Sequence, residues 1–225
     1  MSFTKTAAIG SLAVLASAGL ANPVTLQGAD HSNYNMYTAQ ASSSRGAALT
    51  SMYSDMETGP DGYVAFADTL IEADGELESA GIADYTGVAG GDFLLNQFRF
   101  VGGVDQVGGV VFFDFYDATG GFLDGFGIQL TQAGTFIWTI DLTEAITVAN
   151  SGFIEMSIDD ENLSGAGSAA GGRWFLGNNG ATIGDAGTAE AAPDFNHNFE
   201  LNSVPAPSAL ALLGLGGVVA GRRRR

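Results

Sequence analysis

The middle of this 225-residue chain alternates apolar residues with others at a period of two, which limits its possible folds most strongly. Successive side chains of a β-strand point to opposite faces of a sheet, so this alternation is typical of half-buried strands. Five runs, rich in aromatic and β-branched residues, show it: 97–101, 111–116, 122–130, 135–142 and 153–159. The runs predict β-strands rather than helices.

Turn-forming residues separate these runs, as glycine pairs or as Gly with Ser, Asn or Gln. Glycine accounts for 33 residues, but without the three-residue period of collagen. No repeat of 20–50 residues is evident, which argues against a solenoid. Strands that recur without a long helical stretch predict an all-β fold. We expect an antiparallel β-sandwich, jelly-roll-like, with long Gly/Ser-rich loops.

The pattern is weaker outside this central region. We expect three further strands, at 24–26, 63–71 and 198–201. We also expect long loops, with one helical turn at 72–80, over residues 30–62, 72–91, 163–172 and 177–193.

The first 21 residues have the composition of a secretory signal peptide. Lys5 supplies a positive charge, an apolar stretch covers 7–15, and Gly19-Leu20-Ala21 fits a small-x-small cleavage site. Residues 16–18 are a second candidate for cleavage. The alternative is a buried N-terminal helix, which the Asn22-Pro23 break disfavours.

The last 22 residues form three ordered elements. An extended Val-Pro-Ala-Pro segment is followed by an uncharged stretch over 208–221 and then by four arginines. Fourteen residues of helix extend ~21 Å, which is short of a ~30 Å hydrocarbon core. The arginines favour retention of this end on the cytoplasmic side, with residues 22–207 outside.

This tail resembles the PEP-CTERM sorting signal of Gram-negative bacteria. The matching motif positions are Val204, Pro205, Ala206 and Pro207, with Ala206 where the family usually has Glu, and then Arg222, Arg223, Arg224 and Arg225. The resemblance implies transient anchoring in the inner membrane, removal of the tail by an exosortase, and a final place on the cell surface or in an extracellular matrix. An ordinary C-terminal membrane anchor is the alternative. The expected division is a signal peptide (1–21), one β-sandwich domain (22–203) and a sorting tail (204–225).

The charge of the central domain is more negative than the formal −17 of the whole chain. Five of the eight basic residues belong to the two ends. Arg45, Arg99 and Arg173 then face all 25 acidic residues, a net charge of −22. Such a surface repels phosphates, so we expect no nucleic-acid partner. The absence of cysteine excludes disulfides, thiolate metal sites and cysteine nucleophiles.

No catalytic motif appears in the sequence, so we predict a non-enzymatic protein without catalytic residues. His31 and His197 have no partner at ligand spacing, and we expect both to be solvated. Glycosidases use two carboxylates. Glu144 and Glu155 flank one expected turn and are the pair considered for that role.

Clustered acids are a possible calcium site in an exported β protein, because Ca²⁺ is bound by several oxygens from loops. The candidate clusters are Asp159-Asp160-Glu161-Asn162 and the set Asp114, Asp117 and Asp124. Neither fits EF-hand spacing. We expect solvated acidic loops and no cofactor, with structural calcium as the alternative.

Two aromatic residues, Trp174 and Tyr116, are candidates for an exposed sugar platform. For Trp174 and Trp138 we expect a role in core packing instead. The leading functional prediction is an exported, non-enzymatic protein of the cell surface or matrix. A carbohydrate-binding module acting on exopolysaccharide is the first alternative, and a glycan hydrolase or lyase that uses paired carboxylates is the second.

Overall fold

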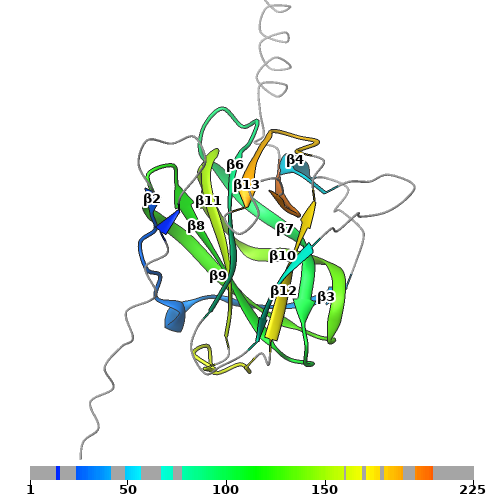
Figure 1. The fold of residues 1–225 in the computed structure, drawn as a ribbon. Helices are drawn as coiled ribbons and strands as arrows, with labels where there is room; N and C mark the ends of the chain where they lie inside the picture. Colours follow the sequence, from blue (N-terminus) through cyan, green and yellow to red (C-terminus); the bar gives the residue numbers. More distant parts are fainter. Residues whose placement is uncertain are drawn as a thin grey trace, which may run out of the picture.

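The computed structural model describes residues 14–15, 24–41, 49–56, 67–72, 78–159, 161–168, 171–177, 180–189 and 196–204. These residues form an all-β fold, with one short 3₁₀ helix, η1 (His31–Asn33), and no α-helix in the described part (Figure 1). The strands are β1 (Val14–Leu15), β2 (Val24–Thr25), β3 (Met36–Ala41), β4 (Thr50–Ser54), β5 (Ala67–Glu72), β6 (Glu78–Thr86), β7 (Phe93–Val104), β8 (Val110–Asp117), β9 (Phe122–Leu130), β10 (Gly134–Val148), β11 (Ser151–Ile158), β12 (Gly171–Gly177), β13 (Asp185–Ala189), β14 (Asn196–His197) and β15 (Phe199–Ser203).

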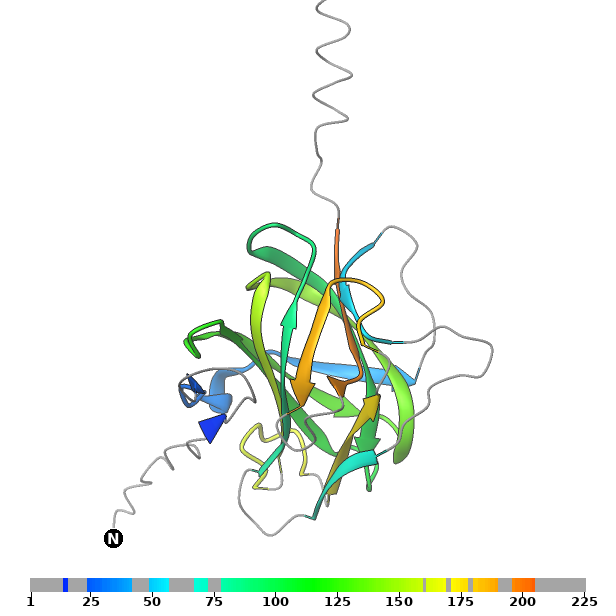
Figure 2. The ribbon, with the colours of Figure 1, turned by 45° about the horizontal axis from the view of Figure 1, so that its top comes forward.

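The strands form two sheets rich in antiparallel pairs, in a sandwich-like arrangement. We call the first sheet I; its strand order is β13-β6-β11-β8-β9. Sheet II is built around β10 and β7, and β7 pairs along its other edge with both β15 and β12. Strands β4, β5 and β14 pair with these outer strands of sheet II. Figure 2 shows β13 (orange) beside β6 at the margin of sheet I.

Strand β3 joins the two sheets. Its residues 36–39 pair with β9 in parallel, and its last two residues pair antiparallel with β10. Every other strand pair described is antiparallel. The long loop expected over 30–62 is therefore wrong where β3 and β4 form. Their polar Ser, Thr and Gln residues give little hydrophobic alternation, so pairing with neighbouring strands decides their conformation.

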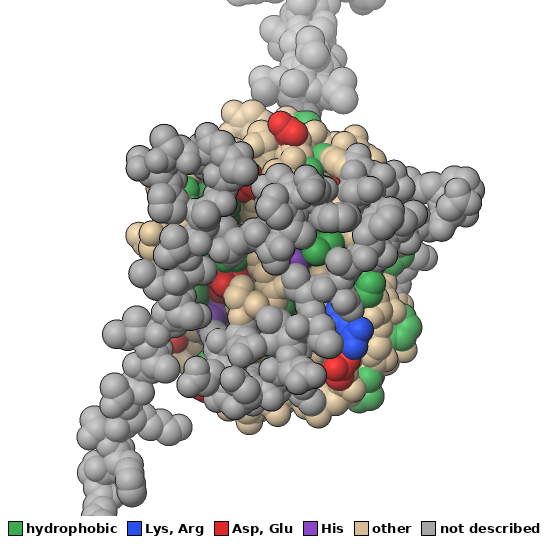
Figure 3. Space-filling view, viewed as in Figure 1, with side chains coloured by type: hydrophobic (Ala, Val, Ile, Leu, Met, Phe, Trp, Pro, Cys, Tyr) green, Lys and Arg blue, Asp and Glu red, His purple; other side chains and the backbone are tan. Residues whose placement is uncertain are grey.

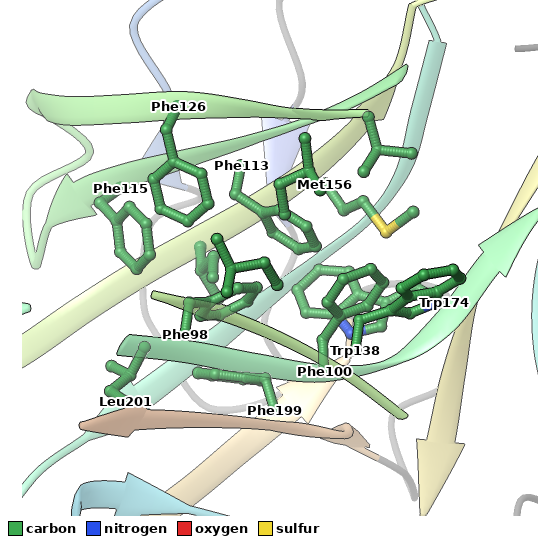
Figure 4. Close-up of a cluster of buried hydrophobic side chains, with 14 of the residues drawn as sticks. Phe98, Phe100, Phe113, Phe115, Phe126, Trp138, Met156, Trp174, Phe199 and Leu201 are labelled. Carbon is green, nitrogen blue, oxygen red and sulfur yellow. The ribbon is translucent and has the colours of Figure 1, made fainter. Parts of the chain in front are cut away.

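The core fills the space between the sheets with aromatic rings. Phe98 from β7 lies 4.5 Å, between ring centroids, from Phe113 of β8, and 5.6 Å from Phe126 of β9. Figure 4 shows these rings meeting from opposite sheets. Trp138 and Trp174 are both fully buried, as predicted for core packing. The indole N–H of Trp138 donates to the Gly102 carbonyl at 2.9 Å.

The five alternating runs coincide with strands β7 to β11, apart from Asp159 directly after β11, which confirms that part of the prediction. The strand expected at 198–201 is β15, and the second half of the one expected at 63–71 is β5. Two further expectations are wrong. Residues 78–86, expected within a helical turn and a loop, form β6, and residues 185–189, expected in a loop, form β13.

The expected targeting segments lie almost entirely outside the described residues. Within the signal peptide only β1 is described, and it pairs with β2. In the sorting motif only Val204 is described, and it follows β15 directly. No helix in the described part has the length and apolar character needed to cross a membrane.

Candidate functional site

A cluster of polar side chains lies on the outer face of sheet I. Asp114 of β8 and Glu155 of β11 are directly opposite each other in the antiparallel register. Directly opposed residues have Cβ atoms about 5 Å apart. The neighbouring side chains with inward parity, such as Phe113 and Ile154, enter the core, so the two carboxylates point away from it. Figure 3 shows acidic side chains beside a histidine on this side of the molecule.

The segment before β3 brings two further side chains to Asp114. His31 Nε2 donates to Asp114 Oδ2 at 2.8 Å, and the Tyr34 hydroxyl donates to Oδ1 at 2.7 Å. Asp30 caps η1 by accepting from the Ser32 amide at 3.1 Å, which fixes the turn that carries His31. Asp114 itself is 1% exposed, so its charge is balanced by these two donors rather than by water.

His31 is positioned by aromatic contacts as well as by hydrogen bonding. Its ring stacks on Phe112 with centroids 4.4 Å apart and an interplanar angle of 25°. The expectation that His31 is solvated is therefore wrong. No local sequence signal predicts the contact, because Asp114 is 83 residues away.

Glu155 has a different environment from Asp114. The Tyr116 hydroxyl donates to Glu155 Oε2 at 3.0 Å. Burial raises the pKa of Glu155, and the nearby Asp114 charge raises it further, whereas the hydrogen bond from Tyr116 and the proximity of His31 act in the opposite direction. Burial likewise raises the pKa of Tyr116. The cluster thus combines Asp114, held by two donors, with a second carboxyl group that retains its proton more readily than an ordinary glutamate.

Tyr116 and Trp174 are not exposed sugar platforms. Tyr116 is 1% exposed and belongs to a small apolar cluster with Leu26, Ile82 and Phe153, on the outer face of sheet I. Trp174 lies in the main core between the two sheets.

Glu144 and Glu155, the carboxylates considered as a catalytic pair, have different partners. The Asn35 amide donates to Glu144 at 3.3 Å, whereas Glu155 accepts from Tyr116. Proximity across the expected turn does not identify the carboxylate that faces Glu155, because the strand register places Asp114 opposite Glu155 instead.

His197 is fully buried, so the expectation of a solvated side chain is wrong here too. Its ring stacks on Trp174 with centroids 4.0 Å apart. Neither ring nitrogen has a hydrogen-bond partner among the described residues. Burial lowers the pKa of His197 to about 3, and nearby backbone groups of Phe175 and Trp174 oppose this only in part.

Asp55, which follows β4, is a buried carboxylate that the sequence analysis did not single out. It accepts from the Phe199 amide at 2.7 Å and from the Asn196 side chain at 2.9 Å. Burial raises the pKa of Asp55 to about 7, although both hydrogen bonds lower it. It therefore fastens the β14–β15 segment to the end of β4.

The described carboxylates of the expected calcium clusters accept hydrogen bonds from within the protein. Asp159 is buried and accepts from the Leu163 amide at 2.7 Å and the Ser164 amide at 3.0 Å. Asp160 lies outside the described residues. No group of three or more His, Cys, Asp or Glu side chains in the described part is placed to hold a metal ion.

The three aspartates of the second cluster have different hydrogen-bond partners. Asp114 binds His31 and Tyr34, whereas Asp117 closes the β8–β9 turn by accepting from the Thr119 and Gly121 amides. Hydrogen bonds from Thr119 and Gly121 hold the pKa of Asp117 below its usual value. Asp124 accepts from the Gly125 amide at 2.8 Å.

The described arginines lie on sheet II. Arg99 of β7 forms a buried ion pair with Glu200 of β15. Arg173 of β12 is half exposed, and its Nε lies 3.7 Å from Asp105.

Comparison with known proteins identifies no relative of this chain. No family model, curated protein or solved structure matches the chain.

Proposed function

We propose that this chain is an exported, non-enzymatic protein of the cell surface or extracellular matrix, sorted through residues 204–225. The observation that supports it most is the position of the motif relative to the fold. Strand β15 packs Phe199 and Leu201 into the core, and Val204 directly after it is 52% exposed. The sorting motif thus starts where the packed strand ends, and a protease can reach it without unfolding the domain.

The same proposal assigns residues 1–21 to a signal peptide and residues 204–225 to an exosortase substrate. Cleavage after Ala21 removes β1 and its two register pairs with β2, but leaves every strand of sheets I and II. A jelly-roll-like strand connection and a C-terminal sorting helix complete the proposed architecture.

A reporter fusion tests this function. An exported reporter carrying residues 204–225 is expressed in two hosts, one with an exosortase and one lacking it. We expect a shortened reporter at the surface of the first host and an uncleaved, inner-membrane reporter in the second. A matched fusion in which Arg222 to Arg225 are replaced by alanine controls for the arginine cluster. Identical processing and location in the two hosts contradict the proposal.

A further inference from the structure

Two partly exposed aromatic rings lie parallel to each other next to the polar cluster of sheet I. The rings of Tyr34 and Phe122 are nearly parallel, with an interplanar angle of 9° and centroids 6.4 Å apart. Tyr34 passes close over Gly125, where a Cβ atom would stand 2.6 Å from the Tyr34 hydroxyl oxygen. Only glycine leaves room for this ring. We call the pair Tyr34 and Phe122 the aromatic shelf.

The shelf is held by contacts on its inner side. Phe112 meets Tyr34 edge-on at 5.9 Å, and Tyr116 meets Phe122 edge-on at the same distance. The hydrogen bond from the Tyr34 hydroxyl to Asp114 fixes the direction in which this side chain points. A surface whose rotamers are set in advance loses little conformational entropy when a ligand binds.

A half-buried carboxyl group borders the shelf. Glu155 lies opposite Asp114 on the outer face of sheet I, and it accepts a hydrogen bond from Tyr116, whose ring packs against Phe122. Carboxylates are strong acceptors for hydroxyl groups. The arrangement therefore offers apolar rings with a hydrogen-bond acceptor at their edge.

We propose that the aromatic shelf binds an uncharged sugar ring of a polysaccharide. The C–H face of a pyranose is apolar and matches an aromatic surface, while the hydroxyls on its rim are donors for Glu155. Anionic glycans are disfavoured, because the described arginines, Arg99 and Arg173, belong to strands of sheet II. Sugar binding by the purified protein does not depend on how the chain is exported.

Affinity electrophoresis of the full chain tests the inference. The gels contain one of four neutral polysaccharides (barley β-glucan, xyloglucan, galactomannan or dextran), or the anionic alginate, or cationic chitosan oligosaccharide. We expect at least one neutral polysaccharide to retard the protein and alginate to have no effect. Tyr34→Ala and Phe122→Ala should each weaken binding by about tenfold. Tyr34→Phe, which keeps the ring, should remain retarded.

Two further measurements separate binding from folding. Val107→Ala removes an exposed apolar side chain, 70% accessible, on a loop between β7 and β8, and should leave retardation unchanged. The urea midpoint of each variant shows whether it is folded, and Glu155→Gln probes the shelf border without removing a ring. Three results overturn the proposal: no neutral polysaccharide retards the protein, chitosan alone does so, or folded Phe122→Ala and Glu155→Gln bind as tightly as the wild type.

Discussion

Replacing Gly81 by alanine tests how the two sheets close over His197. Gly81 lies in β6 with φ of 151°, a conformation that favours glycine. An added Cβ would lie 2.2 Å from Nε2 and 2.6 Å from Cε1 of His197. The imidazole has no room to retreat, because its other neighbour is the stacked ring of Trp174. The substitution therefore brings both a backbone cost and a steric clash.

The expected loss of stability follows from these two terms. A residue held in a sparsely populated backbone conformation costs about 1–3 kcal/mol, and overpacking a core costs about 1–3 kcal/mol more. His197→Ala alone leaves a cavity, which costs about 2–4 kcal/mol. This cost is reduced because the ring nitrogens have no hydrogen-bond partner among the described residues that the substitution would remove. The double variant removes the clash and keeps the backbone cost. Its stability should exceed the additive expectation by about 1–3 kcal/mol.

Urea denaturation followed by tryptophan fluorescence measures this cycle. Gly90→Ala is the matched control, because Gly90 has φ of 76° with no atom within 4 Å of the added Cβ, so only the backbone cost remains. Gly91→Ala, also in open space and without a positive φ, should change stability little. If the Gly81 and His197 effects add to within about 0.5 kcal/mol, the proposed clash is wrong.

Four further outcomes are expected. The pKa of His197 is depressed to about 3, so its contribution is present above the unfolded value of 6.5 and is lost as pH falls. The stability advantage of the wild type over His197→Phe should therefore shrink by about 1.4 kcal/mol per pH unit from 6.5 towards 3 in urea titrations. The pKa of Asp55 is raised to about 7 from 3.8, so its contribution is lost as pH rises through 7, and Asp55→Asn should show a smaller loss between pH 4 and 7 than the wild type. Phe98→Ala should lose about 3–5 kcal/mol, because this fully buried ring contacts both sheets. Calcium and sodium chloride at equal ionic strength should raise the melting temperature equally, since the described acids form no metal-ligating group; a larger shift with calcium would contradict this.

The alternating runs were predictable because their side chains report directly on the two faces of a sheet. Phe113 and Phe115 enter the core while Asp114 between them faces outward, as period two requires. Sequence reasoning missed β3, β4, β6, β12 and β13, which are short or rich in Ala, Gly, Ser and Thr. Such residues carry little hydrophobic contrast, so their strand conformation comes from pairing with partners far along the chain.

The candidate site was beyond the reach of local patterns for a related reason. His31 and Tyr34 precede Asp114 by 83 and 80 residues, and the aromatic shelf joins Tyr34 to Phe122 of another strand. A lone histidine in a polar segment gives no sign of burial by itself. The hydrophobic pattern does mark Phe112 and Phe122 as strand residues, but only the path of the chain over sheet I brings His31 and Tyr34 against them.

The buried acids show how a chain with so few cations keeps carboxylates in its interior. Asp55 uses a backbone amide and an asparagine, Asp159 uses two backbone amides, and Asp114 uses a histidine and a tyrosine. Only Glu200, among the buried acids, has a described arginine as ion-pair partner. Because backbone amides, an asparagine, a histidine and a tyrosine hold these groups, the fold can be strongly acidic without losing its internal polar contacts. The acids on the surface repel anions, which disfavours anionic glycans as partners of sheet I.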